Sequence, residues 1–134
     1  MPQVGKPNSA KPQWVVVQVK LNFRSNGRLP VSAYRHGAVV VHKHVVEVNE
    51  DQSFVRDELW TVSLVETGLR LATVKERADA LRIGLELNKM FHLIISSRTA
   101  DVVKANLPLW VERWLDDCNE SQEYRPFVNY QPRE

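Results

Sequence analysis

Two histidines on either side of a lysine, His42, Lys43 and His44, form the most versatile group of polar side chains in the sequence. Strand residues two positions apart share a face with their Cα atoms about 7 Å apart, and from there two imidazoles can reach one metal ion. A zinc site needs further ligands, and His36, His92 and scattered carboxylates are the remaining candidates. We therefore expect histidines that face water or phosphate, with no metal and no cofactor.

The side chains that could act as nucleophiles lack the sequence context of an enzyme. Ser32, Ser63, Ser96 and Ser97 stand outside any Gly-x-Ser-x-Gly elbow. Neither a phosphate-binding glycine loop nor a dinucleotide fingerprint occurs in the sequence. The acidic neighbours of Cys118 should raise the pKa of its thiol and weaken it as a nucleophile. The expectation is a protein that is not an enzyme.

Charge is distributed unevenly along the 134 residues. Residues 1–46 hold seven Lys and Arg and no Asp or Glu, a formal charge of +7, while the remainder holds 11 Lys and Arg against 16 Asp and Glu and carries −5. Such asymmetry indicates a polyanionic partner for the basic part, or an acidic surface on a second protein. Alternatively, the fold brings the two parts together and their charges cancel.

The candidate binding site combines the early cations with aromatic side chains on or near the first strands. Lys and Arg bind phosphates, and single-stranded bases stack on aromatic rings for about 1–3 kcal/mol each. The residues predicted to bind nucleic acid are Lys20, Arg24, Arg28, Arg35, Lys43, Trp14 and Tyr34. The expected function is a non-enzymatic module that holds single-stranded DNA or RNA on a basic antiparallel sheet face.

A second hypothesis assigns the chain to protein–protein interaction or assembly. Trp110 and Trp114 lie on a helix, and Tyr124, Phe127 and Tyr130 recur every third residue in the C-terminal tail. Because Trp and Tyr are frequent interface anchors, either group could dock a partner, or the tail could dock on its own domain. In either hypothesis we expect a homo-oligomer.

The first strand must position the cations. In residues 14–24 apolar side chains alternate with polar and basic ones, which predicts one face toward the core and a basic face outward. Asn26-Gly27 then predicts a hairpin turn and a return strand over residues 28–35. Pro30 lacks an N–H group, which favours an edge or bulged position for that strand.

The rest of the chain reads as strands followed by helices. Residues 38–48 predict a central valine-rich strand, residues 49–57 a surface loop, and residues 59–65 and 69–72 two further strands. Thr73 and Glu76 fit a capping box that opens a helix reaching at least to residue 90, and residues 91–95 continue it or form a short strand. Gly84 within it indicates close approach of a strand or a partner. Helices over residues 100–106, capped by Thr99, and 108–118 complete the pattern.

Together these elements predict an α+β fold: a four- to five-stranded antiparallel sheet, a packing helix and one or two C-terminal helices. In element order this resembles the transcriptional-coactivator and Whirly type of single-strand-binding folds, which implies a similar use of the sheet. The expected domain spans residues 14–120, between a flexible basic arm at 1–13 and an extended aromatic tail at 121–134. With one cysteine and no apolar run near the ~20 residues of a membrane span, we expect a cytoplasmic protein without membrane contact.

Overall fold

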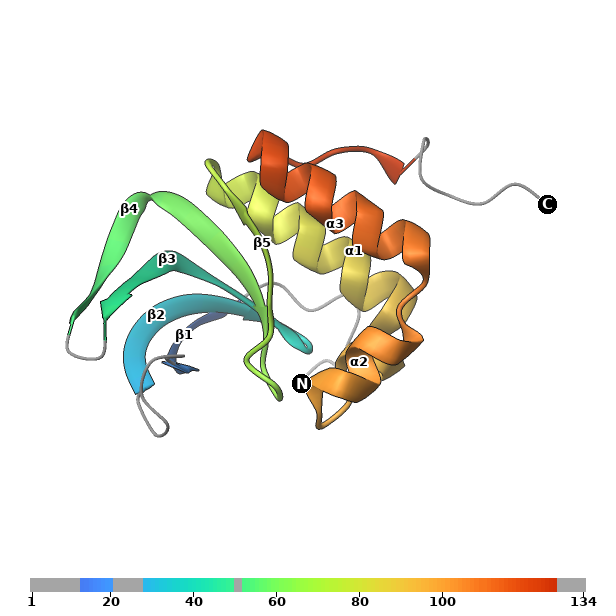
Figure 1. Ribbon diagram of the computed structural model, residues 1–134, viewed down its shortest axis with the longest axis horizontal. Coiled ribbons are helices and arrows are strands. Elements are labelled where there is room, and N and C mark those ends of the chain that lie inside the picture. The colour runs from blue at the N-terminus through green and yellow to red at the C-terminus, as the bar shows by residue number, and fades with distance from the viewer. Residues whose placement is uncertain (1–12, 21–27, 50–51, 128–134) are drawn as a thin grey trace, which may run out of the picture.

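The computed structural model describes residues 13–20, 28–49 and 52–127. Five strands form one antiparallel sheet in the order β1-β2-β3-β4-β5, and three helices follow (Figure 1). The strands are β1 (Gln13–Lys20), β2 (Arg28–His36), β3 (Val39–Asn49), β4 (Gln52–Leu64) and β5 (Arg70–Val74). The helices are α1 (Arg77–Ile95), α2 (Ala100–Asn106) and α3 (Leu109–Ser121). The α+β expectation is confirmed.

The sheet curves strongly along its strands, as Figure 1 shows. β1 pairs with β2 along its whole length, from Gln13 opposite Arg35 to Lys20 opposite Arg28. The described pairing of β2 with β3 is short and joins residues 33–36 to residues 39–42. The first hairpin therefore diverges from the long hairpin of β3 and β4.

The turn between β2 and β3 is tied to the middle of α1. Gly37 adopts φ +58°, a conformation that glycine reaches without steric cost. The buried Asn88 side chain accepts a hydrogen bond from the Ala38 N–H at 3.1 Å and donates to the His36 carbonyl at 2.6 Å. A single side chain of α1 thus satisfies two backbone groups of the turn, the Ala38 N–H and the His36 carbonyl.

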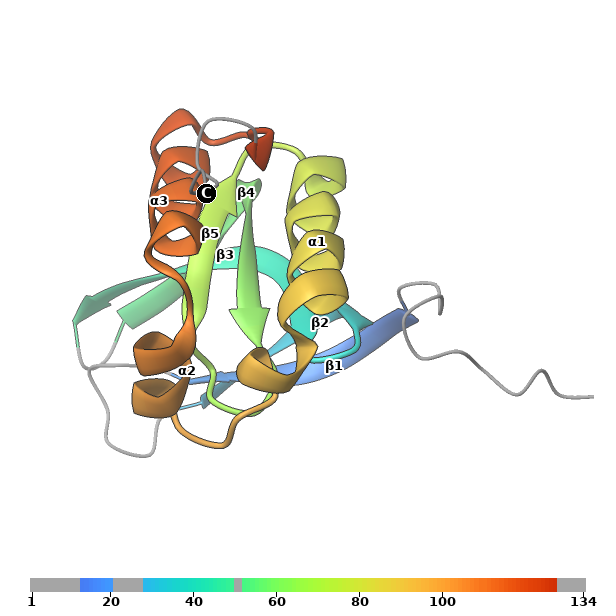
Figure 2. The ribbon, with the colours of Figure 1, turned by 90° about the vertical axis from the view of Figure 1, so that its right-hand side faces the viewer.

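The hydrophobic core lies between one face of the sheet and the helices. α1 packs across β3 and β4, while α3 lies along β5, and Figure 2 shows these two helices on either side of β5. A Cβ atom added at Gly84 would lie 2.9 Å from Val39 Cγ1, so the absence of a side chain lets α1 approach β3 closely. The sequence predicted that Gly84 allows close approach of either a strand or a partner. The structure shows that the strand β3 is the approaching element.

The chain after α3 folds back onto the core as far as residue 127. Trp114 is fully buried, and its ring meets the rings of Tyr124 and Phe127 at centroid distances of 6.1 and 4.5 Å. Trp110 contacts Phe91 and Phe127. The expected docking of the tail on its own domain is therefore found for Tyr124 and Phe127, while Tyr130 lies outside the described residues.

Three expectations about strands were wrong. Residues 52–57 belong to β4, because pairing with β3 satisfies the backbone of this polar segment. β5 continues through Thr73 to Val74, and the helix begins at Arg77 after Glu76, which makes no side-chain cap. β2 lies between β1 and β3 rather than at the edge. Pro30 is tolerated there because the described β3 pairing begins only at Ala33.

The helices predicted after residue 90 are found in the structure. α1 continues to Ile95 with a non-helical φ/ψ pair at Phe91, so residues 91–95 are helix beyond a kink and not a strand. The Thr99 hydroxyl accepts from the Val102 N–H and caps α2 as expected. Pro108 occupies the N-cap of α3.

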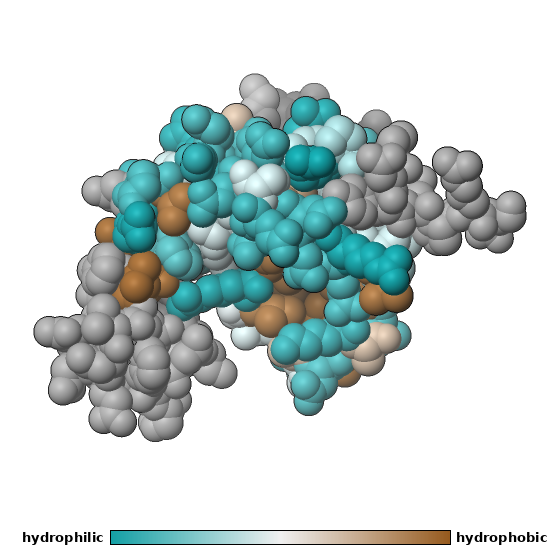
Figure 3. All heavy atoms as spheres, turned by 45° about the horizontal axis from the view of Figure 1, so that its top comes forward, coloured by the Kyte–Doolittle hydropathy of each residue, from teal (hydrophilic) through white to brown (hydrophobic). Residues whose placement is uncertain are grey.

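The surface seen from one side is mostly hydrophilic, as Figure 3 shows. Among the described residues, the large hydrophobic side chains that are exposed include Leu93 and Leu109, at 86% and 60%. In the described part of the chain, none of the helices is long and apolar enough to cross a membrane. The N-terminal arm up to residue 12 and the predicted turn at Asn26-Gly27 lie outside the described residues.

Candidate functional site

Four side chains from β2, β3, β4 and the start of α1 form a group in which cations lie over aromatic rings. Arg77 Cζ lies 4.9 Å from the ring centroid of Tyr34 and 5.8 Å from that of Trp60. Lys43 Nζ lies 5.1 Å from the Trp60 ring centroid. We call Tyr34, Lys43, Trp60 and Arg77 the aromatic–cation cluster. Cations at these distances are attracted to the negative faces of the rings, by about 0.5–1 kcal/mol where exposed.

Strand register explains why these residues meet. Lys43 is paired with Trp60, and Tyr34 is paired with Val41, two positions before Lys43 on the same face of β3. Arg77 is the first residue of α1, and its Nη1 donates to the Tyr34 hydroxyl on this face at 2.9 Å. Tyr34, Lys43 and Trp60 are half-buried, so part of each side chain meets solvent.

The register of the β1–β2 hairpin relates the positions of three predicted binding residues to Tyr34. The register pairs Trp14 with Tyr34 and Lys20 with Arg28, and these four positions belong to one alternating set along the β1–β2 hairpin. Arg35 is exposed, donates from Nε to the Gly37 carbonyl, and belongs to the opposite alternating set. Arg24 lies outside the described residues.

Sequence reasoning missed Trp60 and Arg77. Trp60 falls within the strand expected over residues 59–65 and Arg77 within the helix expected after Thr73, and neither is among the residues predicted to bind nucleic acid. The alternation in residues 59–65 marks Trp60 as a neighbour of core residues, but it does not reveal that Lys43 is opposite. Arg77 could be recognised only with the correct helix start, which the apparent capping box at Thr73 obscured.

Two ion pairs among the described residues join side chains close in sequence. Arg56 pairs with Glu58 across two positions on β4, and Lys89 Nζ lies 3.9 Å from Glu86 Oε1 on α1. A hydrogen bond from the Glu58 backbone and a second one from the Arg56 side chain lower the pKa of the Glu58 carboxyl group. Arg56, Glu58 and Lys89 are exposed and Glu86 is partly buried, so these pairs contribute little to stability.

His42 and His44 lie on the other face of the sheet and bond to threonine and serine. His42 Nε2 is 3.0 Å from Ser63 Oγ, and His44 Nδ1 is 2.9 Å from Thr61 Oγ1. Burial lowers the pKa of both imidazoles, and the Arg70 charge lowers each further. Among the residues that the structure describes, no group of three His, Cys, Asp or Glu could hold a metal ion.

Acid is expected to destabilise the protein through His42. Because its pKa is lowered in the fold, the unfolded chain binds a proton that the native state does not, once pH falls below the unfolded pKa of about 6.5. The free energy of unfolding should therefore decrease as pH falls from ~7 to ~5.5, by at most about 1.4 kcal/mol per pH unit for this group. Urea denaturation at several pH values measures the slope.

The variant His42→Gln is expected to reduce this slope to the part that His44 contributes, because glutamine can still bond to Ser63 but does not titrate. Above pH ~5.5 most Asp and Glu side chains stay ionised, so they contribute little to the slope. An unchanged slope in His42→Gln would contradict the assignment.

Cys118 is buried, and burial raises the pKa of its thiol to about 11. The raised pKa was expected, but its main cause is removal from water, with Asp117 contributing less. A thiol this weakly acidic is a poor nucleophile at neutral pH.

Comparison with known proteins adds no further constraint to this geometry. No family model, no curated protein and no solved structure matches the chain. The class that the described structure defines is an α+β domain with a curved five-stranded antiparallel sheet followed by three helices.

Proposed function

We propose that the chain is a non-enzymatic nucleic-acid-binding module that holds single-stranded DNA or RNA against the aromatic–cation cluster. The observation that carries the proposal is the close placement of Arg77 and Lys43 over the rings of Tyr34 and Trp60. Single-strand-binding surfaces combine the same two components: cations for the phosphates and aromatic rings on which bases stack. The register of the β1–β2 hairpin supports an extended strip, because positions 14, 20, 28 and 34 belong to one alternating set.

The geometry suggests how a strand would bind. Arg77 and Lys43 already lie beside the rings, so a base that stacks on an exposed part of Trp60 or Tyr34 has a cation within reach of its phosphate. Each neutralised phosphate releases condensed counterions, and affinity then falls as salt concentration rises. The cluster also sits where α1 begins, so the rigid helix and sheet fix the spacing between cations and rings.

The test is the binding of fluorescein-labelled oligothymidylate and oligouridylate, followed by fluorescence anisotropy at increasing salt concentration. The double variant Lys43→Gln/Arg77→Gln is expected to lower affinity about tenfold or more and to reduce the salt slope by about 1.4, because each lost phosphate contact removes ~0.7 for a single strand. Trp60→Leu retains apolar volume but loses the stacking surface, and a similar loss of about tenfold is expected.

The matched control is Lys104→Gln/Arg113→Gln, which removes the same charge from exposed positions on α2 and α3. This variant should retain affinity and salt slope. Absence of binding by the wild-type chain at low salt, or equal losses in the control and in the cluster variant, would exclude the proposed surface.

The assembly hypothesis receives less support from the helical tryptophans. Trp114 is fully buried and its indole N–H donates to the Arg125 carbonyl, so its ring serves the protein's own core. Trp110 is half-buried between Phe91 and Phe127. We therefore favour nucleic-acid binding over assembly as the function of the chain.

A further inference from the structure

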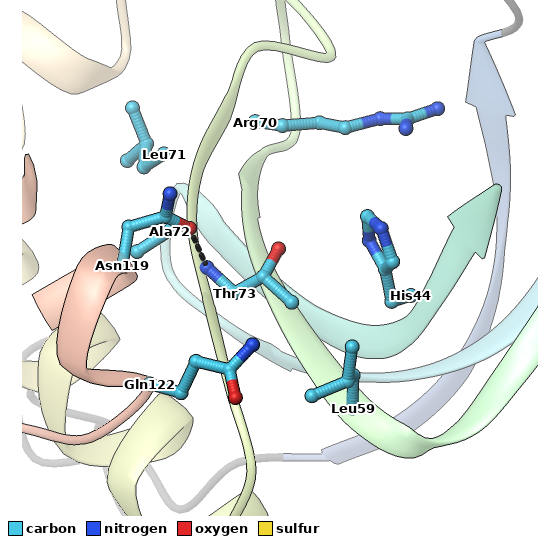
Figure 4. A pocket seen from close by; sticks show the side chains of 8 residues that line it. All are labelled: His44, Leu59, Arg70, Leu71, Ala72, Thr73, Asn119 and Gln122. Atoms are coloured by element: carbon cyan, nitrogen blue, oxygen red, sulfur yellow. Dashed lines mark hydrogen bonds between the residues drawn. The ribbon is translucent and has the colours of Figure 1, made fainter.

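A hollow of about 400 Å³ lies beside β5, within the size range of small-molecule sites. Figure 4 shows the side chains of Arg70, His44, Thr73 and Leu59 around one open space on one side of β5, with Gln122 at its border. None of the described residues that line the hollow is an aspartate or a glutamate. Among these described residues, Arg70 carries the formal charge.

Hydrogen bonds hold the polar side chains of the hollow in place. Arg70 Nη1 donates to the Val45 carbonyl at 3.1 Å. His44 Nδ1 is 2.9 Å from Thr61 Oγ1, which is in turn 3.0 Å from Thr73 Oγ1. Because each group is fixed by a neighbour on β3 or β4, binding a ligand would cost little side-chain entropy.

The backbone next to the hollow is fixed from the side of α3. The Thr73 N–H donates to Asn119 Oδ1 at 2.8 Å, a bond drawn in Figure 4. Gln122 ends α3 in the left-handed conformation, and its carbonyl accepts from the Lys75 N–H at 3.0 Å. The C-terminal end of α3 therefore binds the backbone N–H groups along the outer edge of β5. These contacts form one side of the hollow without a further strand.

The electrostatics of the hollow favour a negatively charged group. Burial lowers the pKa of the His42 and His44 imidazoles, and the positive charge of Arg70 lowers both further. Both rings are therefore neutral near pH ~7. A guanidinium presents a planar set of donors that matches the two oxygens of a carboxylate or phosphate.

We propose that this hollow binds a small organic anion, with its carboxylate or phosphate at Arg70 and Thr73 and its apolar part against Leu59. A bare oxyanion would fill only a fraction of about 400 Å³, so the ligand has an organic body. The site is independent of the aromatic–cation cluster, because His44 and Thr61 lie on the face opposite to Lys43 and Trp60.

The experiment is a nuclear magnetic resonance titration of the whole chain with phenyl phosphate, benzoate and inorganic phosphate, and with benzyl alcohol as the neutral analogue. Saturable changes at the Arg70 Nε–H and His44 ring resonances are expected with at least one of the two aromatic anions, which distinguishes a phosphate ligand from a carboxylate. Binding should also raise the pKa of His44, because the anion offsets the charge of Arg70, while the charge of Arg56 nearby remains unchanged.

Variants separate a specific site from general attraction. Arg70→Gln is expected to weaken anion binding about tenfold or more, since a hydrogen bond between charged groups is lost. Thr73→Val keeps the shape of the side chain and should weaken binding several-fold, and it supplies the test if Arg70→Gln does not fold. The matched control is Arg82→Gln, because Arg82 lies over the Tyr124 ring, 4.2 Å from its centroid.

Three results would overturn the site. They are the lack of saturable shifts with every anion at millimolar concentration, undiminished binding in a folded Arg70→Gln or Thr73→Val variant, and equal binding of benzyl alcohol. Loss of oligonucleotide binding with anion binding intact would instead contradict only the proposed nucleic-acid surface.

Discussion

Replacement of Trp114 by alanine is expected to lower the free energy of unfolding by about 3–5 kcal/mol. The side chain is fully buried, so its removal leaves a cavity between α3, the tail and the core, and it abolishes the contacts with Tyr124 and Phe127. It also leaves the Arg125 carbonyl without its indole donor. Chemical denaturation followed by circular dichroism measures the change.

The same helix offers a matched control for Trp114→Ala. Leu109 is 60% exposed, and Leu109→Ala should change the free energy of unfolding by less than about 0.5 kcal/mol. A loss of similar size in both variants would mean that helix propensity, rather than core packing, sets the stability of α3. A loss below 1 kcal/mol for Trp114→Ala would show that the tail does not depend on this ring.

Replacement of Asn88 by alanine is expected to cost about 3 kcal/mol, because several buried polar groups lose their partner together. Asn88 is 2% exposed and bonds to the Ala38 N–H and to the carbonyls of His36 and Gly84. Each buried group left unsatisfied costs about 1–3 kcal/mol. Amide hydrogen exchange should also show faster exchange at Ala38 than in the wild-type chain.

Asn106→Ala is the control for Asn88→Ala. Asn106 is exposed and donates to the Val102 carbonyl within its own helix, so its removal should cost less than about 0.5 kcal/mol. If Asn88→Ala were as mild as Asn106→Ala, water would be satisfying the turn, and α1 would not hold β2 and β3 together as we infer.

The two faces of the sheet carry different chemistry. On the face that α1 partly covers, cations lie over the rings of Tyr34 and Trp60. On the opposite face, His44, Thr61 and Thr73 form a chain of hydrogen bonds beside Arg70. Strand alternation makes this division possible, because neighbouring residues such as Lys43 and His44 point in opposite directions. The curved sheet can therefore present two separate surfaces built from the same strands.

Local patterns determined much of the fold. Alternation of apolar and polar residues predicted β1 and β3, and helical spacing predicted α1 as far as residue 90. The Thr99 cap and the bounds of α2 also follow from neighbouring residues, since a hydroxyl bonds an N–H three positions ahead. These features involve groups a few residues apart, so the sequence alone contains the information that specifies them.

Tertiary structure decided which groups become partners. Thr73 has the residue type and spacing of a helix cap, but its hydroxyl meets Thr61 and its N–H meets Asn119, 46 residues away, so the segment remains a strand. The polar start of β4 becomes a strand because β3 lies beside it. The aromatic–cation cluster depends in the same way on where α1 begins relative to Trp60. Sequence periodicity sets the direction of each side chain, whereas only folding brings distant side chains within contact distance.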